Sequence, residues 1–170
     1  VSPDGTKLAV IELQALKVVD LRTGEETTYP LADNDPALAL AHPSWSPDGT
    51  MLVLERYDES VDGGRVVLVT FDGAEDVLNA ASTVAEADDV GTPMFPTFDD
   101  DGGILLVRQR SVEGAPTGEA RMERYAVYGD GAPAERGVTY PQPLVALNRS
   151  AGGFLVRLLA DGTVELDVTD

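Results

Sequence analysis

The sequence predicts an all-β fold assembled from repeated antiparallel sheets. A turn motif built around Asp-Gly recurs along the 170 residues, and an apolar run rich in β-branched residues follows each copy. No stretch shows a sustained helical period with capping residues. Hydrophobic residues make up 43% of the chain, which allows a sizeable core, yet no apolar stretch approaches the ~20 residues of a transmembrane helix.

The repeated turn defines four units. Ser2-Pro3-Asp4-Gly5-Thr6 recurs as Ser46-Pro47-Asp48-Gly49-Thr50, 44 residues later. Weaker copies are Phe98–Gly103 and Asn148–Gly153. The apolar runs that follow the four copies cover residues 7–11, 51–54, 104–107 and 154–156. Asp-Gly tolerates the positive φ of a tight turn and the preceding proline fixes its entry, so each copy predicts a hairpin between two strands.

Each unit continues with a second β-rich run, which predicts the next strand of the same sheet. These runs cover residues 16–21, 65–70, 122–128 and 163–168. Glycine turns close the first three, at Thr23-Gly24, Asp72-Gly73 and Gly129–Gly131, and Asp161-Gly162 precedes the fourth. Small antiparallel sheets repeated at this spacing are typical of a β-propeller.

The units predict a propeller segment of about four blades with four-stranded sheets, divided roughly as residues 1–41, 42–92, 93–140 and 141–170. Residues 43–47 and 94–98 are expected as inner strands, with Trp45 between neighbouring blades. Outer strands are expected near Asp76–Asn79 and Gly137–Tyr140. The first unit starts after its inner strand and the fourth stops before its outer one, giving about fourteen strands. We therefore expect a larger ring, completed by further chain or by self-association.

The segment from Trp45 to Thr50, followed by an apolar strand and by Val66-Val67-Leu68-Val69, resembles the PD40 repeat of TolB-like, WD40-like β-propellers. The resemblance covers nearly the whole chain, most clearly its first two units. It implies a bacterial, non-catalytic scaffold or binding module whose protein or peptide partner engages a propeller face or the central funnel. It also implies a periplasmic, extracellular or cell-surface location, while the sequence leaves a cytoplasmic one open.

Two other functions fit the same resemblance. One is an accessory propeller of a hydrolase, such as a serine peptidase, whose catalytic domain lies outside this chain. The other is a calcium-binding or sugar-active propeller. Fold alone does not separate them, because propellers carry many unrelated functions.

Composition narrows the partners. Thirty acidic residues against twelve basic ones give a formal charge of −18 and a pI near 4.1. Such a surface repels nucleic acid and anionic membranes, so neither is expected as a partner, and we attribute the acidity mainly to solubility. The absence of cysteine excludes disulfides, cysteine-ligated zinc, iron–sulfur clusters and a thiol nucleophile in this chain.

His42 is the only histidine, which excludes a multi-histidine metal site in this chain. Ser44 and Ser46 lie nearby in sequence, but no Gly-x-Ser-x-Gly elbow presents a nucleophile to it. We expect His42 to hydrogen-bond to a neighbouring blade.

The acidic triplets Asp33-Asn34-Asp35 and Asp99-Asp100-Asp101 resemble fragments of calcium loops, but neither continues as an EF-hand. Because Asp4, Asp48 and Asp101 recur at equivalent positions, we expect a repeated turn role, with calcium binding as the alternative. Asn148-Arg149-Ser150 fits a glycosylation sequon, but it falls on a repeat turn. Longer loops are expected at 80–92 and 111–119. The sequence thus predicts no catalytic, cofactor-binding or metal-binding residue.

Overall fold

The computed structural model describes residues 1–12, 14–31, 38–58, 63–71, 76–112, 115–129, 131–149, 154–159 and 161–168. Within them the chain forms strands and turns and no helix, so no helix in this part could cross a membrane. The strands are β1 (Lys7–Glu12), β2 (Ala15–Asp20), β3 (Glu26–Pro30), β4 (Leu38–Trp45), β5 (Met51–Asp58), β6 (Gly63–Thr70), β7 (Ser82–Glu86), β8 (Thr92–Phe98), β9 (Ile104–Val112), β10 (Ala115–Tyr125), β11 (Glu135–Tyr140), β12 (Leu144–Arg149), β13 (Phe154–Leu159) and β14 (Val164–Val168).

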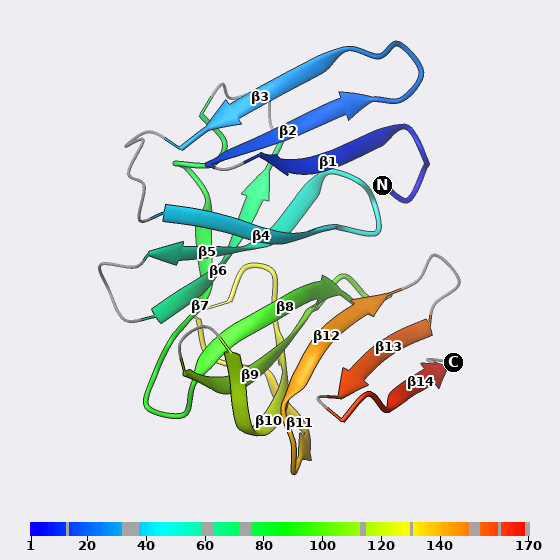
Figure 1. Ribbon diagram of the computed structural model, residues 1–170. Coiled ribbons are helices and arrows are strands. Elements are labelled where there is room, and N and C mark those ends of the chain that lie inside the picture. The colour runs from blue at the N-terminus through cyan, green and yellow to red at the C-terminus, as the bar shows by residue number, and fades with distance from the viewer. Residues whose placement is uncertain are drawn as a thin grey trace.

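Four antiparallel sheets follow one another along the chain, each made of consecutive strands (Figure 1). Sheet 1 holds β1–β3, sheet 2 β4–β7, sheet 3 β8–β11 and sheet 4 β12–β14. β4 packs beside β1 and β8, and β8 packs beside β12, so the first strands of successive sheets lie next to one another. The predicted all-β class is confirmed. β1 corresponds to β5, because each follows a copy of the repeated turn. In sheet 2, β4 pairs with β5, but the described residues contain no strand that pairs with β1 in the same way.

The repeated turn has the same hydrogen bonds in both strong copies. Ser2 Oγ donates to Asp4 Oδ1 at 2.6 Å and Thr6 N donates to the same oxygen at 3.0 Å. Asp48 accepts the equivalent bonds from the serine hydroxyl and threonine amide of the second copy at 2.6 and 3.0 Å. The serine hydroxyl and the threonine lower the pKa of Asp4 to about 2. The expected turn role is confirmed for these two aspartates.

In the third copy, a different aspartate holds the turn. Asp99 occupies the position of Ser46, and its Oδ1 accepts a 2.7 Å bond from the Gly103 amide. Its Oδ2 accepts a 2.5 Å bond from Arg124 Nε on β10. Asp99 therefore makes these turn bonds, whereas the sequence favoured Asp101.

The outer strand of sheet 2 is not where the sequence placed it. Residues 76–80 form a turn closed by a 3.1 Å bond from the Ala80 amide to the Asp76 carbonyl, and β7 begins at Ser82. Val77 and Leu78 are both buried, and they fill the core instead of pairing in the sheet. The expected loop over 80–92 therefore contains a strand. β11 confirms the outer strand expected at Gly137–Tyr140.

The second expected loop, over 111–119, is also largely strand. β9 continues to Val112 and β10 starts at Ala115, with a register shift between Thr117 and Ala120. Gly118 has a φ of 73°, so glycine permits the bulge that absorbs the extra residues.

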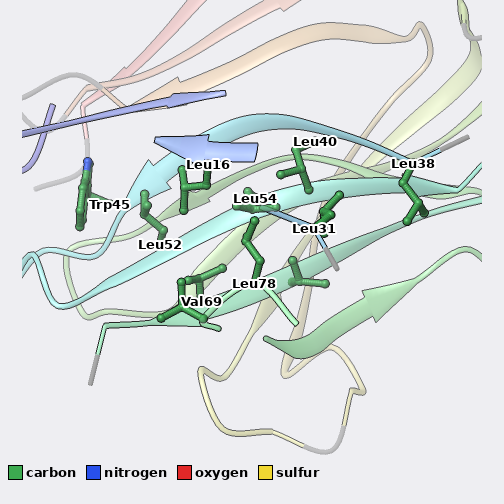
Figure 2. Close-up of a cluster of buried hydrophobic side chains, with 11 residues drawn as sticks. Leu16, Leu31, Leu38, Leu40, Trp45, Leu52, Leu54, Val69 and Leu78 are labelled. Atoms are coloured by element: carbon green, nitrogen blue, oxygen red, sulfur yellow. The ribbon is translucent and has the colours of Figure 1, made fainter. Parts of the chain in front are cut away.

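Among the described residues, the core consists of three apolar clusters, one at each junction between successive sheets. β5 serves two of them because its side chains alternate: Leu52 and Leu54 belong to the cluster with sheet 1, whereas Val53 belongs to the cluster with sheet 3. Trp45 packs in the first cluster, with its ring centroid 5.4 Å from that of Phe71 (Figure 2). Its predicted burial between sheets is confirmed. Each fully buried leucine contributes about 1.5–3 kcal/mol, so these junctions hold the sheets together.

Candidate functional site

His42 lies within β4, and its imidazole is oriented by a buried carboxylate. His42 Nδ1 is 2.9 Å from Glu55 Oε1, whose side chain is 1% exposed. The Tyr57 hydroxyl and the Phe95 amide also donate to Glu55. The hydrogen bond to Glu55 raises the pKa of His42. The predicted hydrogen bond from His42 to a neighbouring sheet is therefore wrong, because its partner Glu55 lies in the same sheet. His42 reaches sheet 3 through a ring contact with Phe95.

That ring contact joins two unusual backbone positions. The His42 and Phe95 rings pack edge to face at 4.9 Å, and both residues have positive φ, 50° and 54°. Each sits at a register shift in the first strand of its sheet. Non-glycine residues at positive φ are costly, so the bonds to Glu55 hold both bulges in place.

The serines near His42 have other partners. Ser44 Oγ is 3.2 Å from Thr97 Oγ1 on β8, and Ser46 Oγ donates to Asp48. The imidazole and the nearby hydroxyls therefore bond to separate groups, and both sets of bonds support the strands and turns.

A groove of about 800 Å³ lies between the outer strand of sheet 2 and sheet 3. One wall is β7 with the turn that follows it, residues 83–90. Side chains of β9 and β10 form the floor, and Gly129, Gly131 and Pro133 form the other wall. The groove thus follows the outer strand of one sheet and the face of the next.

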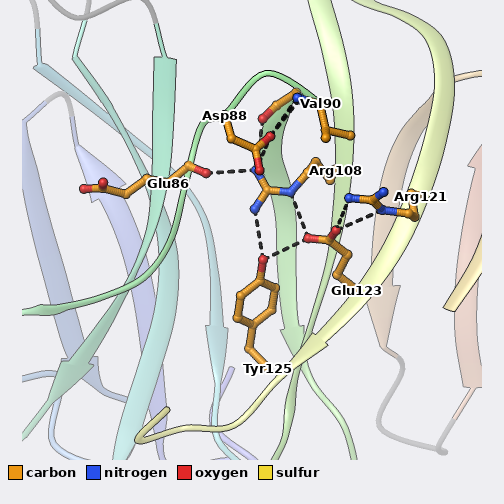
Figure 3. A network of polar contacts seen from close by, with 8 residues as sticks. Glu86, Asp88, Val90, Arg108, Arg121, Glu123 and Tyr125 are labelled. Atoms are coloured by element: carbon orange, nitrogen blue, oxygen red, sulfur yellow. Dashed lines mark hydrogen bonds and ion pairs between the residues drawn. The ribbon is translucent and has the colours of Figure 1, made fainter. Parts of the chain in front are cut away.

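Arg108 forms the centre of the groove floor and bonds to both sheets (Figure 3). Its side chain is 4% exposed, and its Nε donates to Glu123 Oε2 at 2.8 Å. Nη2 donates to the Tyr125 hydroxyl at 2.9 Å. Nη1 donates to the carbonyls of Glu86 and Gly91 at 2.8 and 3.0 Å. One guanidinium therefore ties β7 and the following turn to sheet 3.

Glu123 completes the network and has no lone pair left for a ligand. Its Oε2 accepts a second bond, at 2.8 Å, from the Tyr125 hydroxyl. Its Oε1 accepts bonds from Arg121 Nε and Nη2 at 2.9 and 2.5 Å. Burial raises the pKa of Glu123, but the hydrogen bonds from Arg108 and Tyr125 outweigh it, so the pKa is lowered. The carboxylate therefore stays ionised at neutral pH, as a fixed part of the floor.

Asp88 stands at the edge of this network. Its Oδ1 is 3.2 Å from Arg108 Nη1, and its side chain is 47% exposed. Partial burial raises the pKa of Asp88, but the amides of Gly91 and Val90 and the charge of Arg108 lower it by more. The pKa of Asp88 is therefore below its usual value. The groove thus presents an ionised carboxylate to solvent.

The network belongs to sheet 3 because two of its side chains have apolar counterparts in sheet 2. Arg56 and Arg65 face each other across β5 and β6, as Arg108 and Arg121 do across β9 and β10. Sheet 2 carries Val67 and Val69 where sheet 3 carries Glu123 and Tyr125. Arg56 Nε accordingly has no hydrogen-bond partner among the described residues.

Sequence reasoning missed this network. The available signal was a set of charged residues inside runs that otherwise alternate as strands, at 108, 121 and 123. As for metals, no three acidic or histidine side chains in the described ranges come close enough to hold an ion, and Asp33-Asn34-Asp35 lies outside those ranges.

No protein-family model matches the chain, and no curated protein matches its sequence. Solved structures match in shape: TolB from Acinetobacter baumannii has a TM-score of 0.59 at 17% identity, over 97% of this chain and 41% of that one. The β-propeller is the fold of this chain. Dipeptidyl peptidase 4 from Porphyromonas gingivalis gives 0.60 at 14% identity, over 99% of this chain and 30% of that one. A calcium-binding regucalcin from Agrobacterium tumefaciens has a TM-score of 0.58 at 15% identity, over 97% of this chain and 54% of that one.

The chain spans about half, or less, of each of these propeller proteins. At these identities the likeness concerns the fold alone, which agrees with the propeller expected from the repeats. The four sheets are therefore blades 1 to 4, in the order of sheets 1 to 4. The groove lies between the outer strand of blade 2 and blade 3.

Proposed function

We propose that this chain is a non-catalytic propeller module of the TolB-like kind, which binds a protein or peptide partner outside the cytoplasm. The observation that carries the proposal is the groove between blades 2 and 3. Its volume of about 800 Å³ falls within the range of about 300–1,000 Å³ that is usual for ligand sites. Its floor is held in one arrangement by Arg108 and Glu123, so a partner meets a preformed surface.

The polar groups of the chain support binding over chemistry. A general base needs a proton acceptor within reach of a substrate. Each Glu123 oxygen accepts two bonds from the protein, and the hydroxyls of Ser44 and Ser46 bond to Thr97 and Asp48. These groups hold strands and blades in register. The hydrolase-accessory function would place the chemistry in flanking sequence and would leave the same groove free for recognition.

Site-specific photo-crosslinking tests the proposal. Val90 lines the groove and is 41% exposed, so a benzoylphenylalanine placed there reports what enters it. Leu21, 47% exposed in the turn after β2, provides a matched control position on blade 1. We expect one protein adduct at position 90 that is missing at position 21, and binding of that purified protein by calorimetry. Equal labelling at both positions, or turnover of a substrate by the purified chain, would contradict the proposal.

A further inference from the structure

We infer that the groove binds an extended peptide segment that carries lysine or arginine side chains next to apolar ones. This inference rests on the proposed function and names the chemistry of its partner. It depends on three features of the groove: the closed floor, the charge of its rim and the exposed apolar side chains beside it.

The floor has few hydrogen-bonding groups left for a ligand. The Arg108 donors are directed at Glu123, Tyr125 and two carbonyls. Glu123 accepts four bonds, and Tyr125 both donates and accepts. A ligand carboxylate or phosphate could pair fully with Arg108 only by displacing Glu123, whose side chain is 1% exposed and would lose this ion pair at large cost. An anionic ligand is therefore disfavoured.

The rim, in contrast, offers carboxylates to solvent. Asp88 is 47% exposed, Glu86 is 65% exposed and Asp89 lies exposed beside them. Glu86 directs its carbonyl at Arg108, while its carboxylate points away from the network and lies 3.8 Å from Arg65 (Figure 3). The groove lining as a whole carries four carboxylates and two guanidinium groups. Charge complementarity thus favours a cationic ligand, and the −18 charge of the chain attracts one from a distance.

Two exposed apolar side chains accompany the groove. Val90 lines it directly, and Tyr128 immediately precedes Gly129, a residue of its far wall. Tyr128 is 82% exposed, and its hydroxyl lies 3.7 Å from Met51 Sδ on blade 2, so it stands where blades 2 and 3 meet. Exposed tyrosines of this kind are frequent anchors in protein interfaces. The ligand should therefore combine apolar and basic residues.

Fluorescence anisotropy with synthetic peptides tests this chemistry on the intact chain. The probe is a labelled ten-residue peptide alternating lysine with valine and threonine, compared with counterparts in which glutamine or glutamate replaces each lysine. The groove variants are E86Q/D89N and Y128A. The matched control is E25Q/D101N, which removes two exposed carboxylates that do not line the groove.

We expect the lysine peptide to bind most tightly. E86Q/D89N should weaken it by about 5- to 20-fold at low salt, with the loss shrinking as salt rises. Y128A should weaken it by about 10-fold with no change of charge. The control should change affinity by less than about twofold. Equal losses in the control and the groove variants would overturn the inference, since the peptide would then sense only the overall charge.

The same experiments separate this inference from the proposed function. If crosslinking at position 90 identifies a partner whose contacting segment is acidic or neutral, the binding module stands and the cationic-peptide inference is wrong. If no partner is captured yet the lysine peptide binds and responds to Y128A, the groove chemistry stands and the biological role must be sought elsewhere.

Discussion

Removal of the Glu123 carboxylate tests whether the buried ion network holds blade 3 against blade 2. Glu123→Leu keeps the side-chain volume similar but leaves Arg108, 4% exposed, without its closest anion. Breaking one partner of a buried pair costs about 3–5 kcal/mol, and we expect about 3 kcal/mol because Asp88 remains 3.2 Å from Nη1. Arg108→Met should cost at least as much, since the carbonyls of Glu86 and Gly91 also lose their donor.

The double variant decides whether this cost comes from the pair. Once Glu123 and Arg108 are both apolar, no charge is left buried alone, so the summed single losses should exceed the double loss by about 2 kcal/mol. Urea unfolding followed by far-ultraviolet circular dichroism gives all four free energies. Additivity within about 0.5 kcal/mol would refute the reasoning. The lowered pKa of Glu123 adds a pH dependence: its stabilisation is present above the unfolded pKa of about 4.3 and is lost as the pH falls through the folded value.

Three further predictions concern other parts of the fold. Because Glu55 raises the pKa of His42, the stabilising charge is present below about pH 6.5 and is lost as the pH rises through the folded pKa. In paired urea titrations, the difference in unfolding free energy between wild type and His42→Gln should be larger at pH 5.5 than at pH 9, by at most about 0.5 kcal/mol. Gly91→Ala should cost about 2–3 kcal/mol because its Cβ would lie 2.6 Å from the β9 backbone; Gly5→Ala, with open space around it, should cost only about 1 kcal/mol by thermal unfolding. Trp45→Ala should cost about 3–5 kcal/mol and Trp45→Phe well under half of that, because the indole Nε1 has no hydrogen-bond partner in the described part of the chain; calorimetry distinguishes the two losses.

The turns and the strands beside them could be predicted from the sequence because they depend on local chemistry. Asp48 and Gly49 specify their turn through bonds to residues two positions away and through a φ of 70°. The burial of Trp45 followed from the same repeat. The outer strand of blade 2 could not be predicted in this way. Val77 and Leu78 have the composition of a strand, and contacts with distant parts of the core place them in a turn.

The groove network depends on pairings that no local pattern contains. Arg108 meets Glu123 only because β9 and β10 pair in one register, which the bulge before Ala120 sets. The carbonyl of Glu86 comes from another blade. In the sequence, Arg108 directly follows the apolar run 104–107. His42 shows the same limit: its partner Glu55 is thirteen positions away and becomes a neighbour through the pairing of β4 with β5.

The position of Arg108 has a consequence for the order in which blades should form. β7 is the outermost strand of blade 2, and the carbonyl of Glu86 is on the side that faces away from β6, because the Ala87 amide bonds to Gly64. An uncovered strand edge can pair with another molecule and start aggregation. Arg108 occupies that carbonyl, and the turn at Gly131 lies against the carbonyl of Val84. Blade 3 therefore shields the edge of blade 2, and a folding intermediate with blade 2 alone would be the species most prone to aggregate.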